Sequence, residues 1–367
     1  MLIVACISGH GYGHGSRVAA LLAALQRLEP HCRFVLSTPL PKKFLNQTFA
    51  AIPHIHHHCQ WDVGVIQADA LASDPLATLK ALDELEPKLA AQVENQVALI
   101  TAMRWPGEAA LVLADVPPAA VLLAEGLGVP LVWQANFGWD SIYQELGGPL
   151  LSWAEQSNQL YRRGAATLRC PFSLGMDWDL PQKQIGLSAG TPSFTSHELR
   201  QRFGWGWEKQ KTALLSFGGI GFACTHQLLE QWPDWGFVVT DPELAKASNA
   251  RLLPADLRPL DLMPICSVVI TKPGYSTFCE ALGQGLGVIA VERQGFAEAE
   301  VLMAGLKEHG WHRQLSLAAF LAGDWHLDTP LTPPTKPALA RGGEIEAAQL
   351  LIKILRTSIL RQTASRE

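Results

Sequence analysis

Charge is scarce in this chain of 367 residues, and its lysines and arginines form no cluster. Asp, Glu, Lys and Arg make up 17% of the residues, and the net charge is -5. A protein without a basic patch does not attract the phosphate backbone of nucleic acids over long range. We therefore expect no nucleic-acid partner.

Long apolar runs are also absent from the sequence. No stretch is long enough to span a bilayer. The N-terminal run Leu2–Ile7 is short, lacks a basic leader and passes directly into glycine and histidine, which is atypical of a signal peptide. We therefore expect a core strand here and a cytoplasmic protein.

Cysteine and histidine show no metal-ligand spacing. The seven cysteines are odd in number and scattered, which argues against a disulfide framework. In the run His56–His58, neighbouring side chains of a strand would point to opposite faces, so a single site would use only alternate histidines. We predict no metal site.

Apolar residues are abundant, but they come in short runs. They make up 48% of the chain, enough for two domains of ordinary size that each bury a core. The runs alternate with stretches of helical periodicity, a pattern typical of parallel sheets with crossover helices. We predict an α/β protein with two doubly wound, Rossmann-like domains. The expected strands are Leu2–Ile7, Arg33–Ser37, Leu111–Ala114, Val129–Gln134, Thr212–Phe217, Gly236–Thr240, Ser267–Thr271 and Gly287–Val291.

Composition also predicts the domain boundaries. We expect an N-terminal domain over residues 1–182, a polar, turn-rich linker over 183–211, a second domain over 212–340 and a last helix within 341–367. The apolar face of that helix, Glu344–Leu360, is expected to dock on the N-terminal domain, with peripheral membrane contact as the alternative. Open α/β sheets bind ligands outside the carboxyl ends of their strands, so two facing domains would enclose a central cleft. The oligomeric state is not indicated.

A glycine-rich loop joins the first predicted strand to a helix. The sequence GHGYGHGSR spans residues 9–17 and contains His10 and His14. Glycine lets the backbone turn tightly and approach a ligand, and amides at a helix N-terminus favour an anionic or oxygen-rich ligand. An imidazole there can transfer protons near neutral pH. An ordinary βα turn with surface histidines is the alternative interpretation.

A second loop, in the C-terminal half, has the chemistry of a phosphate and ribose site. After the strand Ser267–Thr271, a Pro-Gly turn leads into a helix that we expect to begin near Ser276. Gly274 would let the backbone approach a diphosphate, and Ser276 and Thr277 would cap the helix and offer hydroxyls. Glu280 would accept hydrogen bonds from a ribose diol; a solvated glutamate near the helix dipole is the alternative.

Two further strand ends would contribute to the same site. The glycine loop FGGIGF, residues 217–222, would face the phosphates. After the strand Gly287–Val291, the sequence ERQGFAEAEVL offers polar groups suited to sugar hydroxyls, with ordinary helix-surface polarity as the alternative. The further residues expected at this site are Lys272, Gly218, Gly219, Glu298 and Glu300.

These motifs resemble a known group of proteins. GHGYGHGSR, the segment 62–79, ADVPPAAVLLAEGLGVP, NFGWDSIY and TKPGYSTFCEALGQG follow one another as in the glycosyltransferase-like N-terminal half of L-arabinokinase. The resemblance covers most of residues 1–310, and it extends more distantly to GT-B glycosyltransferases, including the UDP-glycosyltransferases. It implies the GT-B fold. In a chain of this length it does not imply sugar-kinase activity.

The resemblance also implies roles for particular residues. His14 corresponds to a catalytic base, Asp115 to the aspartate that orients it, and Glu280 to the glutamate that holds the ribose. Glu298 and Glu300 occupy the place of the polar pair that binds the donor sugar in the related transferases. Because this sequence departs from the usual pair, the identity of the donor sugar is left open. The implied reaction is an inverting, metal-independent transfer from a nucleotide sugar, with UDP as the expected nucleotide, to a hydroxyl of a small-molecule or lipid-linked acceptor. The nucleotide sugar is the substrate, and no cofactor is expected.

Other polar and aromatic residues are expected to border the acceptor. Trp139 would stack on a sugar face, while structural hydrogen bonding is the alternative for the polar residues Asp69, Asn136 and Asp140. The full acceptor-side set is His10, Arg17, Asp69, Asn136, Trp139 and Asp140.

Two other functions remain open at this point. Gly13, His14 and Arg17 fit equally the loop of a nucleotide-sugar hydrolase of the same fold, in which water would be the acceptor. A noncatalytic module that binds sugar nucleotides is the second alternative.

Overall fold

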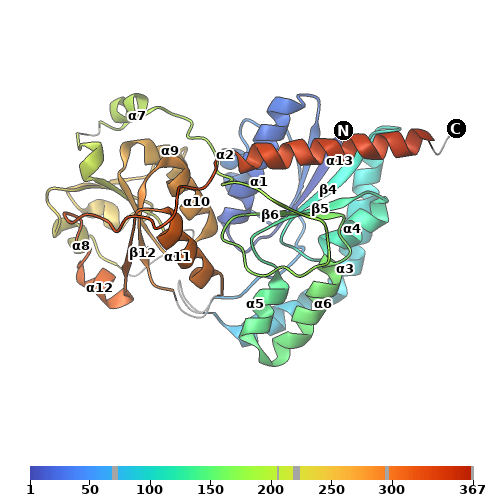
Figure 1. The fold of residues 1–367 in the computed structure, drawn as a ribbon, viewed down its shortest axis with the longest axis horizontal. Coiled ribbons are helices and arrows are strands. Elements are labelled where there is room, and N and C mark those ends of the chain that lie inside the picture. The colour runs from blue at the N-terminus through green and yellow to red at the C-terminus, as the bar shows by residue number, and fades with distance from the viewer. Residues whose placement is uncertain (68–72, 205, 218–223, 294–296, 365–367) are drawn as a thin grey trace. The chain divides into compact units, whose positions relative to one another are not determined.

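The computed structural model describes the whole chain except residues 68–72, 205, 218–223, 294–296 and 365–367; the side chains of 358–364 are also left undescribed. The chain forms two compact units (Figure 1). The first contains Ser73–Ser188, the described residues before them and the chain from Gly342 onward. The second contains Ala189–Arg341. The predicted linker 183–211 is therefore divided between the two units.

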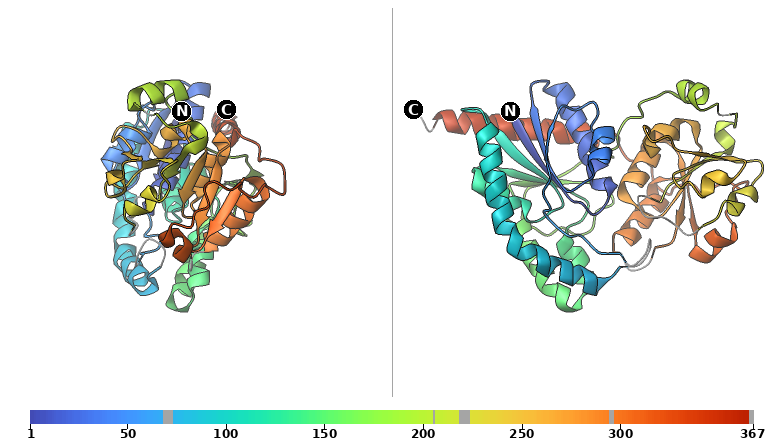
Figure 2. Two further views of the ribbon diagram at one scale, coloured as in Figure 1. Left: turned by 90° about the vertical axis from the view of Figure 1, so that its left-hand side faces the viewer. Right: turned by 180° about the vertical axis from the view of Figure 1, so that it is seen from behind.

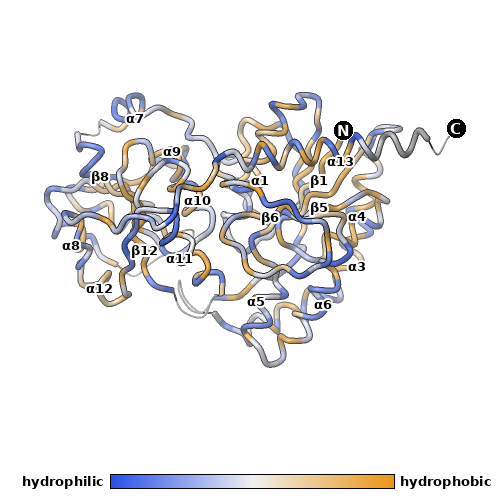
Figure 3. Tube along the Cα trace, viewed as in Figure 1, coloured by the Kyte–Doolittle hydropathy of each residue, from blue (hydrophilic) through white to orange (hydrophobic). Residues whose placement is uncertain are grey.

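The described part of the first unit contains a parallel sheet with the strand order β3-β2-β1-β4-β5-β6-β7. The order reverses at β1, whose neighbours are β2 and β4. Its central strands are buried along their length and are coloured as hydrophobic in Figure 3, because helices cover both faces of such a sheet. The strands are β1 (Leu2–Ile7), β2 (Arg33–Ser37), β3 (Ile55–His57), β4 (Ala110–Asp115), β5 (Leu131–Ala135), β6 (Ala166–Arg169) and β7 (Gln182–Gln184).

The helices of this unit other than α13 lie between its strands in the chain, and the longest of them, α3, runs along one side of the unit (Figure 2). The C-terminal helix α13 packs on α1 through buried side chains such as Leu351 and Leu355, and Arg356 forms an ion pair with Glu29. The helices are α1 (Tyr12–Leu28), α2 (Lys42–Thr48), α3 (Pro75–Met103), α4 (Ala120–Leu127), α5 (Trp139–Leu146), α6 (Leu151–Tyr161) and α13 (Gly343–Ala364), with the 3₁₀ turn η1 (Gly148–Leu150).

The second unit repeats this topology. The strand order of its described sheet is β10-β9-β8-β11-β12-β13, all parallel, and it reverses at β8. The strands are β8 (Thr212–Leu215), β9 (Gly236–Val239), β10 (Ala250–Leu252), β11 (Val268–Thr271), β12 (Gly287–Val291) and β13 (His312–Leu315). The helices are α7 (Ser196–Phe203), α8 (Gln227–Glu230), α9 (Pro259–Leu262), α10 (Tyr275–Gln284), α11 (Ala297–His309) and α12 (Leu317–Ala322), with the 3₁₀ turns η2 (Lys209–Lys211), η3 (Leu244–Lys246) and η4 (Met263–Ile265).

The predicted α/β class with two doubly wound sheets is confirmed, and every predicted strand overlaps an observed one. Sequence reasoning missed the edge strands β3, β7, β10 and β13 and the short interior strand β6; β7, for example, reads QKQ and is exposed. Over the described residues, no helix has the length and apolar character needed to cross a membrane.

Candidate active site

The first unit brings His14 and Asp115 together at the point where its strand order reverses. Asp115 ends β4, and the strand register places it beside Ile7, the last residue of β1. His14 lies in the first turn of α1, directly after the glycine loop that leaves β1. Its Nδ1 is 2.7 Å from Oδ1 of Asp115. Ligands of open α/β sheets bind at such a reversal, outside the carboxyl ends of the strands.

This contact fixes which nitrogen of His14 carries the proton. A carboxylate can only accept a hydrogen bond, so Nδ1 of His14 donates, and the neutral ring keeps its lone pair on Nε2. The Asp115 side chain is fully buried, whereas 11% of the His14 side chain remains exposed. The pair therefore has the geometry of a general base held by a buried carboxylate.

Arg17 completes this arrangement from the next turn of α1. Its Nε donates to Oδ2 of Asp115 at 2.8 Å, its Nη2 to Oδ1 at 2.7 Å, and its Nη1 to Oδ1 of Asn136 at 2.6 Å. Burial alone would raise the pKa of Asp115, but the charge of Arg17 and the hydrogen bonds from His14 and Arg17 outweigh it. The pKa of Asp115 is consequently held below its ordinary value, and the carboxylate stays ionised.

The strand end at Asp115 is strained. Val116 has a φ of 80° although it is β-branched, and its carbonyl accepts a hydrogen bond of 2.6 Å from the hydroxyl of Tyr161. The Tyr161 hydroxyl also accepts from the backbone N–H of Trp139 at 3.0 Å. A residue of this type in the left-handed region costs roughly 1–3 kcal/mol. The surrounding contacts therefore hold the turn after Asp115 in a conformation that the chain would not adopt alone.

His10 is held in place by contacts with the backbone around Gly64 and with Trp139. Its Nδ1 accepts a hydrogen bond from the backbone N–H of Val65 at 3.2 Å, and its ring meets the edge of Trp139 at 5.0 Å between centroids. Gly64 has a φ of 70°, and a Cβ there would lie 2.6 Å from the His10 ring. Glycine is therefore required beside this histidine.

Trp139 and Asp140 turn out to be packing residues in this structure. The Trp139 side chain is fully buried, and its Nε1 donates to Asp62 at 2.7 Å, so its ring does not offer a face for sugar stacking as expected. Asp140 accepts hydrogen bonds of 2.9 Å from both Trp178 and Asn158, which is the structural alternative considered for it. Loop position in the sequence did not reveal that these side chains fold inward.

Asp62 was not expected near His14. Burial raises the pKa of its carboxyl, while hydrogen bonds from Trp139 and Ser8 and the proximity of His14 lower it, with burial dominating. Its motif was noticed only as part of the segment 62–79. Asp69, from the same segment, lies outside the described residues.

In the second unit, Glu280 lies on α10 with a carboxylate that has no hydrogen-bond partner among the described residues. Burial raises its pKa to about 7; the charge of Arg258 opposes this effect, and that of Asp261 adds to it. A half-buried carboxylate without protein donors is suited to accept the two hydroxyls of a ribose.

Arg258 and Asp261 form an ion pair beside Glu280 that sequence reasoning missed. Arg258 donates from Nε at 3.0 Å and from Nη2 at 2.7 Å to Asp261, and its Nη2 also reaches the carbonyl of Thr191 at 2.9 Å. The backbone N–H of Ser193 donates to Asp261 at 2.8 Å. The two residues are three apart at the start of α9, whereas their further partners Thr191 and Ser193 come from the segment before α7.

Two cations lie after neighbouring strands of the same sheet. Lys272 follows β11 and Arg293 follows β12. Burial and the charge of Arg293 lower the pKa of Lys272 to about 8, and burial lowers the pKa of Arg293 against the opposing charge of Glu298. Glu298 is buried near the start of α11, whereas Glu300 is exposed. The cost of desolvating two neighbouring cations would be offset by an anionic ligand.

The helix that follows Lys272 begins one residue earlier than expected. Its N-cap is Gly274, no side chain caps it, and Tyr275 is its first residue. Ser276 and Thr277 therefore lie inside the first turn, and the prediction that they cap the helix is wrong. Their hydroxyls remain near the helix N-terminus, where amides attract anions. Gly218 and Gly219, expected to face the same phosphates, lie outside the described residues.

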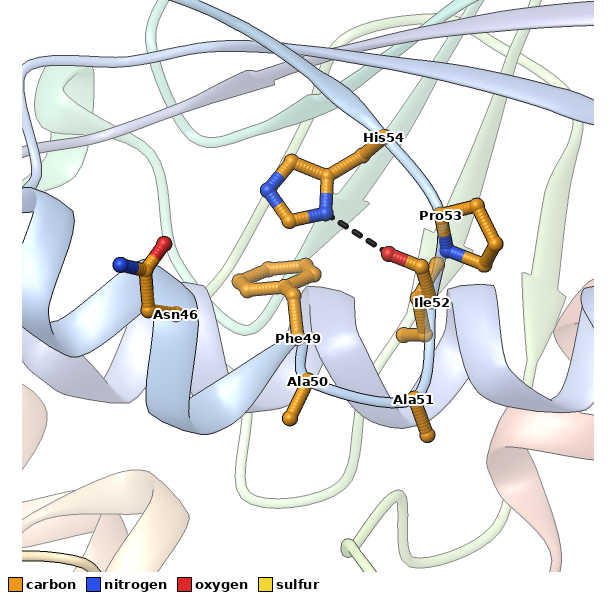
Figure 4. A pocket seen from close by; sticks show the side chains of 7 residues that line it. All are labelled: Asn46, Phe49, Ala50, Ala51, Ile52, Pro53 and His54. Carbon is orange, nitrogen blue, oxygen red and sulfur yellow. Dashed lines mark hydrogen bonds between the residues drawn. The ribbon is translucent and has the colours of Figure 1, made fainter.

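The histidine run lies elsewhere in the first unit. His54 Nδ1 bonds to the carbonyl of Ile52 at 2.7 Å at a surface hollow of about 440 Å³ that includes none of the predicted site residues (Figure 4). His56 Nε2 bonds to the carbonyl of Thr38, and His57 Nδ1 to Gln96. Within the described parts of the chain, no three His, Cys, Asp or Glu side chains are arranged to hold a metal ion.

Two parallel sheets that reverse at β1 and β8, each with polar groups at that reversal, define the GT-B class of fold, and comparison with solved structures agrees. A UDP-glucosyltransferase from Polygonum tinctorium capable of glucosylating indoxyl has a TM-score of 0.62 at 12% identity over 97% of this chain and 98% of its own. Arabidopsis thaliana UGT89C1, complexed with UDP-L-rhamnose, has a TM-score of 0.59 at 12% identity over 98% of each chain.

Among curated proteins, L-arabinokinase of Arabidopsis thaliana is 26% identical over 353 residues, which is 93% of this chain and 33% of that protein. The chain thus spans about a third of the length of this relative. No family model matches. The predicted resemblance to L-arabinokinase and to GT-B UDP-glycosyltransferases is confirmed.

Proposed function

We propose that the protein is an inverting glycosyltransferase, which moves a sugar from a UDP-sugar to a hydroxyl of an acceptor. The fold is that of enzymes described as UDP-glucosyltransferases, and UGT89C1 binds a UDP-sugar. The observation that carries the proposal is the His14–Asp115 pair at the strand-order reversal of the first unit.

His14 would act as the general base. Its Nε2 would take the proton of the acceptor hydroxyl while the hydroxyl oxygen forms a bond to the anomeric carbon and the bond from that carbon to the diphosphate breaks. Attack from the face opposite the leaving group inverts the anomeric configuration. Asp115 would stabilise the imidazolium that forms, because its carboxylate already accepts from Nδ1.

The donor would bind to the second unit. Glu280 would accept hydrogen bonds from the ribose diol, and the amides at the start of α10 would meet the diphosphate. Lys272 and Arg293 would place fixed positive charge toward the leaving UDP. Such fixed charge can stabilise a departing diphosphate without a metal ion, and we propose a metal-independent transfer.

A nucleotide-sugar screen tests the proposal. Donors that raise the melting temperature are first selected and are then incubated with small-molecule and lipid-linked acceptors, followed by product analysis. His14→Asn should lower the rate of glycoside formation roughly 10²- to 10⁴-fold, whereas His31→Asn, at an exposed position, should leave it unchanged. Free sugar released from donor alone would indicate the hydrolase, and tight binding without turnover would indicate a noncatalytic module.

A further inference from the structure

We propose that Arg17 is a positioning residue, which orients the carboxylate of Asp115 and keeps His14 a neutral base with its lone pair on Nε2. The proposal rests on the proposed function, because it assigns His14 the role of base. Arg17 thereby joins His14 and Asp115 as a third residue of the candidate site.

Helix geometry places both basic side chains on one carboxylate. His14 and Arg17 are three residues apart on α1, so they lie on the same face of the helix. Oδ1 of Asp115 accepts from both side chains, at 2.7 Å each, and Oδ2 accepts from Nε of Arg17 at 2.8 Å. The two-point contact prevents rotation of the carboxylate, so Oδ1 remains directed at Nδ1 of His14.

Asn136 fixes the third side of the guanidinium. It follows β5, the neighbour of β4, and its Oδ1 accepts from Nη1 of Arg17 at 2.6 Å. The fork of Arg17 therefore joins the ends of β4 and β5, and the three side chains Arg17, Asp115 and Asn136 are all buried. A lysine has the same charge but cannot make this three-point contact.

The positive charge of Arg17 also affects the electrostatic environment of His14. Arg17 and Asp115 neutralise each other, so an imidazolium at His14 would be a second cation on one carboxylate. Among the described residues, Asp62 also interacts electrostatically with His14, and a negative charge on Asp62 would favour the imidazolium. Removal of the Arg17 charge would leave Asp115 and Asp62 to hold a proton on the ring.

Two substitutions separate geometry from charge, with Arg27→Met in the exposed last turn of α1 as the control. Arg17→Lys keeps the charge but loses the fixed orientation of the Asp115 carboxylate. We expect kcat to fall about tenfold and the donor KM to stay within about twofold of its original value. The acid limb of the pH profile of kcat should stay in place. Arg17→Met removes the charge; we expect the acid limb to move up by about one pH unit.

A second measurement does not depend on activity. ¹⁵N NMR of the histidine rings should show His14 with its proton on Nδ1 in the unaltered protein and a mixture of tautomers in Arg17→Lys. In Arg17→Met the ring should stay doubly protonated to higher pH. If Arg17→Met does not fold, Arg17→Lys alone decides the question.

Unchanged kcat and unchanged ring signals in Arg17→Lys would overturn the proposal, as would an Arg17→Met protein with an unmoved acid limb. If the unaltered protein transfers no sugar, the proposed function fails, while the ring signals still decide whether Arg17 fixes the tautomer of His14.

Discussion

Acidification should weaken the binding of a UDP-sugar to the second unit. The carboxyl of Glu280, with a pKa of about 7, would have to lose its proton to accept two ribose hydroxyls. Binding therefore favours the ionised form and releases a proton. Affinity is retained above this pKa and is lost as the pH falls through it.

The size of the effect follows from the pKa. At about pH 6, roughly ten of every eleven unliganded molecules carry a protonated Glu280, whereas at about pH 8 roughly one in eleven does. Protonation of Glu280 alone should thus raise the Kd of UDP-glucose about tenfold from about pH 8 to about pH 6, or about 1.4 kcal/mol. Close to half a proton should be released on binding at about pH 7.

The protonation of Lys272 should determine the alkaline limb of the pH dependence of the Kd. Its pKa of about 8 means that it loses its charge as the pH rises, and a neutral amine attracts the diphosphate less. We expect the Kd to rise about fourfold at about pH 8.5, because roughly three of every four unliganded molecules then carry a neutral Lys272. The affinity optimum should lie between the two limbs.

Isothermal titration calorimetry in two buffers with different ionisation enthalpies measures both the Kd and the number of protons released. Glu280→Gln should remove the acid limb, and Lys272→Met the alkaline limb. Glu308→Gln, which removes an exposed carboxylate that pairs with Lys336, should change neither limb. A Kd for UDP-glucose that is constant across this range would refute the reasoning.

Three further predictions concern the first unit. His14→Ala should lower kcat roughly 10²- to 10⁴-fold with donor affinity nearly unchanged, and Asp115→Asn should lower kcat less. A kcat that barely changes in the His14 variant would exclude His14 as the base. Removal of residues 343–367 should lower the melting temperature by about 10 °C or more. The reason is that the apolar side chains that α13 buries on α1 stabilise the fold by about 1.5–3 kcal/mol each. A shortened chain that melts at the same temperature would contradict this prediction. Gly64→Ala should lower the free energy of unfolding by more than about 1 kcal/mol, since the alanine Cβ would meet the His10 ring at a position with a positive φ. Equal denaturant midpoints for the variant and the unaltered protein would contradict this prediction and show that the loop moves to accommodate the Cβ.

The sheets were predictable because their strands are buried on both faces and therefore read as continuous apolar runs. Leu2–Ile7 and Gly287–Val291 are examples, and both form strands within the predicted bounds. The edge strand β7 was not predictable, because its exposed residues carry no apolar pattern. The start of α10 was misplaced by one residue, because an N-cap glycine offers no side-chain signal.

The glycine loop indicated a histidine suited to proton transfer, and the resemblance to GT-B glycosyltransferases pointed to His14 and not to His10. The contact of His14 with Asp115, 101 residues away in the chain, required the pairing of β1 with β4. Arg258 and Asp261 are only three residues apart at the start of α9, but their contacts with Thr191 and Ser193 could not be predicted, because those residues belong to a distant segment.

Sequence alone thus determined the class of fold and the strand ends that carry polar groups, since these depend on local patterns of burial and chemistry. Only the tertiary structure decided that Trp139 is buried against Asp62 and that Arg17 shares one carboxylate with His14. Burial and ion pairing are sums over neighbours in space, and those neighbours are brought together by the sheet and not by the order of residues in the chain.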